Sequence, residues 1–172
     1  MNRTNDMNRR KSIGLLGLGP LFLSQNAYSF GQEIDPNFID LFKVRWDWNR
    51  IYAFEILEDM PESKFAFKPR EGMMSFNKLF THIGKDIDGY ARVLDGVAPK
   101  DEPETIEKVV VSNYLKSCFE HFESAYRSLN EAELHTKNHY FPSVEPWMNF
   151  NVFDIIMLAY NHSVHHQGQH EK

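Results

Sequence analysis

The chain has 172 residues, and its 24 Asp and Glu outnumber its 19 Lys and Arg to give a formal net charge of −5. An acidic chain of this kind is excluded as a nucleic-acid-binding protein, because neutralising phosphates requires clusters of Lys and Arg. The length allows one ordinary domain with a single core. The single cysteine, Cys118, excludes an internal disulfide, so packing alone must hold the fold.

Residues 1–29 have the layout of a cleaved secretory signal peptide. Residues 7–11 form a basic segment, and residues 13–23 form an apolar run. The small residues Ala27 and Ser29 then precede the expected cleavage site. The apolar run is about half of the ~20 residues that span a bilayer, so we expect no membrane span in the mature form. Arg9-Arg10 resembles a twin-arginine export signal. The alternative is a disordered, apolar N-terminal tail.

Residues 30–172 are predicted to form the single mature domain. Removal of residues 1–29 takes away four basic side chains and one acidic one, which leaves 15 basic and 23 acidic residues and a net charge of −8. An exported protein without disulfides is compatible with a bacterial periplasm. We therefore expect an exported, periplasmic protein.

Four segments of this domain carry apolar residues at helical 3–4 spacing. The first begins with Asp35-Pro36 and ends before Pro61, and the second begins with Ser75 as N-cap and ends at Gly96. The third begins near Pro103 and runs to about residue 129, and the fourth covers about residues 151–166. Residues 62–74 and 130–146 are predicted loops. The fold class is therefore an all-α four-helix bundle, and the long third connection suggests at least one crossover.

The fourth predicted helix carries His162 and His166, which lie four residues apart on the same helix face. They continue the apolar stripe of this helix, so both side chains should point into the bundle. Neutral imidazole is the commonest transition-metal ligand, and this spacing suits Zn²⁺, Ni²⁺ or Fe²⁺. The alternative is a pair of core histidines that are satisfied by hydrogen bonds.

The second predicted helix supplies the best third ligand, His82, which lies next to the apolar positions Leu79 and Ile83. Bundles build metal sites from side chains on facing helices. Three protein nitrogens leave coordination positions open, which is typical of a catalytic metal site. Asp86, one turn beyond His82, is a candidate outer-shell acid that orients an imidazole; a fourth ligand or a surface acid are the alternatives.

The remaining histidines are weaker candidates. We expect His121 on the polar side of the third helix, His165 near a loop or solvent, and His135 and His139 as exposed loop residues. Cys118 falls on an apolar stripe and is interpreted as a small core residue. The apolar segments around Phe67, Met73-Met74 and Trp147 are core or loop residues that could also wall a pocket above the metal.

The chain resembles the DinB/YfiT-like superfamily of metal-binding four-helix bundles over about residues 36–170. The motifs that carry the resemblance are Phe76-Asn77-Lys78-Leu79-Phe80-Thr81-His82-Ile83, the closing His162-x-x-x-His166-Gln167-Gly168-Gln169, and a first helix and loop from Trp48-Asn49 through Pro61-Glu62 to Phe67-Lys68-Pro69. The family commonly has Arg where this chain has Gln167. The resemblance implies a bundle with a crossover, a divalent metal ion held by His82, His162 and His166, and frequent homodimerisation.

The function that follows is a metal-dependent hydrolase or thiol S-transferase acting on an unknown small-molecule substrate. A metal ion can lower the pKa of a bound water or thiol and polarise an electrophile. The sequence assigns no catalytic side chain and no organic cofactor. Characterised relatives include thiol-dependent transferases, but their thiol cofactors are cytoplasmic, so export disfavours that reaction. The alternative function is a non-catalytic metal-binding or dimerisation module.

Overall fold

The computed structural model describes residues 37–104, 107–135, 137–139 and 150–169. The predicted signal peptide and the predicted start of the first helix at Asp35-Pro36 lie outside these residues. The described elements belong to one compact unit, residues 34–172. None of the described helices is both long and apolar enough to cross a membrane.

Four long helices make up most of this unit, as the sequence predicts: α1 (Phe38–Asp59), α2 (Phe76–Asp95), α3 (Lys108–Arg127) and α5 (Val152–Gln167). The third of them begins at Lys108, several residues after the predicted start near Pro103. The connection that was predicted to be a loop contains a short helix, α4 (Glu131–Leu134), and a short strand, β1 (Lys137–His139). This strand pairs antiparallel with β2 (Phe150–Asn151), directly before α5. A 3-10 turn, η1 (Glu62–Lys64), follows α1.

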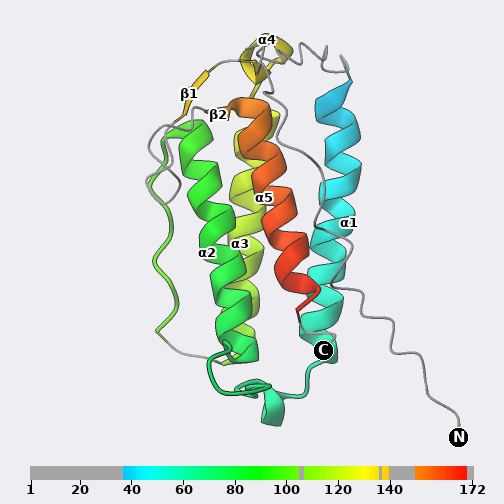
Figure 1. Cartoon of the computed structure of the whole chain (residues 1–172), viewed down its shortest axis with the longest axis vertical. Coiled ribbons are helices and arrows are strands. Elements are labelled where there is room, and N and C mark those ends of the chain that lie inside the picture. The colour runs from blue at the N-terminus through cyan, green and yellow to red at the C-terminus, as the bar shows by residue number, and fades with distance from the viewer. Residues whose placement is uncertain (1–36, 105–106, 136, 140–149, 170–172) are drawn as a thin grey trace, which may run out of the picture. The chain divides into compact units, whose positions relative to one another are not determined.

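The bundle contains a crossover, which confirms that part of the predicted fold class. Helix α2 packs against α3 and α5, and α1 packs against the same two helices. Figure 1 shows that α2 and α3 run in the same direction, whereas α5 runs in the opposite direction to α2. Parallel neighbours require a connection that returns along the bundle. The second connection, residues 96–107, is therefore the long crossover, although the sequence suggested the third.

Local sequence signals explain where the site-bearing helices begin and end. Gly96 adopts a φ of +75° at the end of α2, a left-handed conformation that glycine reaches without steric cost. Asn151 and Asp154 form a reciprocal capping box at the start of α5, in which each side chain accepts the other's backbone N–H. These caps fix the two helices that carry the histidines.

Aromatic side chains fill much of the bundle core. Trp46 is fully buried, with ring centroids 4.6 Å from Phe122 and 5.0 Å from Phe119. Such pairs add to the stabilisation that burial of the ring area provides. Cys118 is also fully buried, and burial, followed by the charge of Asp88, raises the pKa of its thiol to about 12. A thiol that stays protonated is unreactive, which agrees with a core role for Cys118.

Candidate metal centre

The candidate site lies where α2 begins and α5 ends. Because the two helices are antiparallel, a step of four residues toward the end of one matches a step of four toward the start of the other (Figure 1). His82 therefore faces His166, and Asp86 faces His162 one turn away. The sequence places these four residues together only if α2 and α5 are neighbours, and they are.

Three histidines converge at this point. The Nε2 atoms of His82 and His166 are 3.2 Å apart. One ring nitrogen from each of His82, His162 and His166 lies within 4.8 Å of the corresponding nitrogens of the other two. All three side chains are half-buried. The structure thus brings together the three residues that the sequence singled out, in a group that could hold a metal ion.

Asp86 lies on the same side of the rings as the converging nitrogens. Its Oδ2 atom is 2.8 Å from His162 Nε2 and 3.6 Å from His82 Nε2. The short distance to His162 is an ion-pair distance without hydrogen-bond alignment, and His162 Nε2 remains a buried atom without a hydrogen bond. His162 Nε2 therefore faces the carboxylate and the converging nitrogens without an aligned hydrogen bond.

The charges at the site favour a cation. Burial acts to raise the pKa of the Asp86 carboxyl, but its contacts with His162, His82 and His166 outweigh burial and hold the pKa below its usual value. Asp86 is therefore ionised at neutral pH. Burial also lowers the pKa of His166, with smaller contributions from the neighbouring imidazoles, although a hydrogen bond to Gln169 opposes the shift. A neutral imidazole beside a carboxylate is the protonation state that binds metals.

Gln169, which belongs to the closing motif but had no role assigned from the sequence, orients His166. The Nδ1 atom of His166 is 3.0 Å from Oε1 of Gln169. An amide oxygen can only accept, so Nδ1 carries the proton and the lone pair of Nε2 faces His82. A partner on the distal nitrogen is the usual way of fixing a metal-binding imidazole. The sequence signal for this contact is the spacing of three residues between His166 and Gln169, which places the two side chains one helical turn apart.

A buried amide network fixes the end of α5 against α1. The side chain of Gln167 donates to Asn49 Oδ1 at 2.7 Å and to Ser163 Oγ at 2.9 Å. All three residues are buried. Gln167 directly follows His166, so this network restricts movement of the ligand-bearing turn. Glutamine is usually exposed, which is why its burial was not expected from the sequence.

The residues present fit a divalent transition metal. Imidazole nitrogens suit zinc, iron and nickel alike, so the donor set does not select among them. The buried His162 Nε2 atom lacks a hydrogen bond, and a metal ion would supply the missing partner. The anionic Asp86 would balance part of the added charge.

Outside this group, the prediction for His121 was wrong. His121 is mostly buried rather than on a polar face: its Nδ1 lies 2.6 Å from Asp88 Oδ1 and its Nε2 lies 2.9 Å from Asp95 Oδ2. His165 is exposed, as expected, with its Nε2 3.0 Å from Gln169 Nε2. His135 is exposed as well, whereas the side chain of His139 and all of His170 lie outside the described residues.

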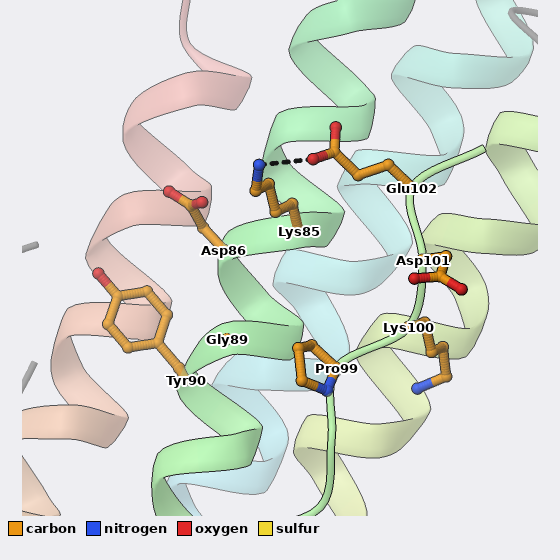
Figure 2. A pocket seen from close by; sticks show the side chains of 8 residues that line it. All are labelled: Lys85, Asp86, Gly89, Tyr90, Pro99, Lys100, Asp101 and Glu102. Atoms are coloured by element: carbon orange, nitrogen blue, oxygen red, sulfur yellow. Dashed lines mark ion pairs between the residues drawn. The ribbon is translucent and has the colours of Figure 1, made fainter. Parts of the chain in front are cut away.

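A polar pocket of about 390 Å³ borders Asp86 along α2 and the crossover. Figure 2 shows Asp86 and Tyr90 extending from α2 toward α5, whereas Lys85 meets Glu102 of the crossover at an ion-pair distance. The other lysine, Lys100, pairs with Asp88. Both cationic side chains of this pocket therefore already have acidic partners.

Comparisons with known proteins agree with this fold. The family model described as the DinB superfamily matches residues 45–170. A DinB-like protein from Bacillus cereus ATCC 10987 has a similar solved structure, with a TM-score of 0.63 and 18% identity over 76% of this chain and 87% of its own. A conserved protein from Enterococcus faecalis gives a TM-score of 0.62 and 17% identity over 76% of this chain and 91% of its own. No curated protein matches this chain. With a family match over most of its length, the chain belongs to the DinB superfamily.

Proposed function

We propose that this protein is an exported metal-dependent enzyme that acts on a small molecule. His82, His162 and His166 would hold one divalent ion of zinc, nickel or iron. The observation that carries the proposal is the convergence of three ring nitrogens from two helices, one of them buried without a hydrogen bond. A bound ion would lower the pKa of a water or thiol and polarise an electrophile.

The surrounding side chains support chemistry beyond metal binding. Gln169 holds the tautomer of His166, and the ionised Asp86 lies close enough to His162 and His82 to accept a proton or to complete the coordination shell. Hydrolysis is favoured over thiol transfer if the protein is exported, because low-molecular-weight thiols are cytoplasmic. A screen of ester, amide and phosphoester substrates against thiol-plus-electrophile mixtures compares the two reactions directly.

The first test is metal stoichiometry. After reconstitution with Zn²⁺, Ni²⁺ or Fe²⁺ and removal of excess metal, we expect about one ion per wild-type chain by mass spectrometry of the digested protein. His82→Ala should retain little metal. His165→Ala is the matched control, because His165 is exposed on the same helix and lies outside the convergent group. Wild-type protein that holds no near-stoichiometric metal would refute the site.

X-ray absorption spectroscopy of the loaded protein separates the enzyme from a non-catalytic metal module. Three imidazole nitrogens and an exchangeable oxygen favour catalysis, since an open position admits substrate. A structural role is favoured if Asp86 closes the coordination shell. In that case the wild type has no exchangeable oxygen on the metal, and Asp86→Asn gains one.

Dimerisation is part of the proposal because α1 exposes an apolar face. Large apolar side chains occur at helical spacing on this face: Leu41, Val44, Trp48 and Ile51. Trp48 is 68% exposed, an unfavourable environment for an indole unless another surface covers it. Sedimentation velocity of the full chain determines whether it is a dimer. Export is tested separately by N-terminal sequencing of the native protein, for which Met1 as the first residue argues against a cleaved signal.

A further inference from the structure

A second, largely apolar pocket of about 470 Å³ opens beside the metal centre. His166 and Gln169 form one side of it, so a molecule in this pocket contacts the candidate metal centre directly. The rest of the wall is mostly apolar and comes from the end of α1, the α1–α2 connector and the start of α2: Met60, Phe67, Met73, Met74, Phe76 and Leu79. The volume lies in the range of small-molecule sites.

The α1–α2 connector contributes apolar side chains to this wall that remain exposed to solvent. Phe67 is 53% exposed and Met74 is 47% exposed. Both residues lie in a segment without α-helix, where water-exposed positions are usually polar. Backbone hydrogen bonds from Phe76 to Phe67 (2.9 Å) and from Asn77 to Phe65 (3.0 Å) tie the connector to the start of α2. The apolar side chains are therefore held in place at the pocket rather than collapsed into the core.

One cation lines this pocket. Arg70 donates through Nε to the thioether sulfur of Met73 at 3.2 Å, a weak acceptor. Among the described residues, no carboxylate lies within ion-pair range of Arg70, although the chain is acidic overall. A turn from Arg70 to Met73, with Gly72 at a φ of +84°, sets the arginine at the pocket. An arginine without a carboxylate beside an apolar wall is suited to an organic anion.

The polar pocket of Figure 2 does not offer this combination. Its Lys85 and Lys100 are already paired with Glu102 and Asp88, and a ligand anion would have to displace those carboxylates. The apolar pocket has an arginine free of acidic partners within the described residues, an apolar wall, and the candidate ligand His166.

We propose that this apolar pocket binds the substrate as a small organic anion with an apolar body. The apolar part would lie against Phe67, Met73 and Met74, its anionic group would pair with Arg70, and its other end would face His166. The inference rests on the proposed function for the identification of this ligand as the substrate. Anion binding itself needs no metal, so the two can fail separately.

The test compares 1-naphthoate with the uncharged 1-naphthamide by isothermal titration calorimetry on the metal-free full chain. We expect 1-naphthoate to bind about two- to fivefold more tightly, because Arg70 is exposed and an exposed ion pair contributes only modestly to affinity. Arg70→Gln should remove this preference and leave naphthamide binding unchanged. Lys68→Gln is the matched control, since Lys68 is an exposed cation of the same connector that does not line the pocket.

Methionine methyl NMR locates the bound probe, with Met73 and Met74 expected to shift. Equal affinity for the two probes, a preference that survives Arg70→Gln, or shifts confined to methionines other than Met60, Met73 and Met74 would overturn the proposal. Repeating the titration on metal-loaded protein separates the two hypotheses. Arg70-dependent anion binding in a chain that binds no metal supports the pocket and contradicts the metal centre. Stoichiometric metal binding without a preference for 1-naphthoate supports the metal centre and contradicts the pocket.

Discussion

Replacing Asp88 by alanine is expected to lower the free energy of unfolding by about 3 kcal/mol. Its side chain is fully buried and has three partners: His121 Nδ1 at 2.6 Å, Lys100 Nζ at 3.0 Å and the backbone N–H of Lys100. Removing one member of a buried pair costs about 3–5 kcal/mol because it leaves an uncompensated charge. We expect the lower end, since the side chain of Lys100 is 38% exposed and can be hydrated.

Denaturant titration of the full chain measures this loss. Asp95→Ala is the matched control, because Asp95 contacts the other nitrogen of the same imidazole but lies nearer to solvent. Its removal should cost about 1 kcal/mol or less, as for exposed ion pairs. Equal losses in the two variants would contradict the view that Asp88 links α2, the crossover and α3.

The same carboxyl makes stability depend on pH. Burial acts to raise the pKa of Asp88, but His121 and Lys100 outweigh burial and hold the pKa below its usual value. The folded state then binds fewer protons than the unfolded state, so this stabilisation is complete above the unfolded pKa and is lost as the pH falls through the folded pKa. The difference in unfolding free energy between wild type and Asp88→Asn should therefore shrink as the pH is lowered below about 4.

Periodicity in the sequence was enough to identify the bundle and the three histidines. The i, i+4 spacing of His162 and His166 on an apolar stripe indicates a shared inward face, and His82 lies in a comparable apolar setting. These signals are local, so they need no knowledge of the tertiary structure. The convergence of the three required one further condition, contact between α2 and α5, which the resemblance to DinB proteins supplied.

Other features depend on contacts between distant residues and could not be predicted in the same way. His121 and Asp88 are 33 residues apart, and the acidic neighbours of His121 in the sequence suggested a solvated face. The crossover was assigned to the longest connection, but helix direction decides which connection must return along the bundle. The environment of Arg70 likewise depends on how the connector folds against α2 and α5.

His162→Ala is expected to lose the stabilisation that metal gives the wild type, with little effect on the metal-free protein. At a metal concentration 100-fold above the dissociation constant, binding stabilises the wild type by about 2.7 kcal/mol. For a chain of this size, that is a rise of about 5–10 °C in melting temperature. Loss of a ligand should weaken binding by at least the roughly 100-fold upper limit for outer-shell partners, leaving about 0.4 kcal/mol or less.

The stability of the metal-free proteins provides a second comparison between wild type and His162→Ala. Substituting His162 removes packing and the ion-pair contact of its Nε2 with Asp86 Oδ2, both at a half-buried position, so we expect the metal-free proteins to differ by about 1 kcal/mol or less. His165→Ala should behave as wild type throughout. Gln169→Ala should bind metal roughly 10- to 100-fold more weakly, because it keeps the ligand but loses its orientation. A large loss in metal-free His162→Ala, or equal metal-induced shifts in wild type and variant, would mean that these histidines stabilise the bundle without binding metal.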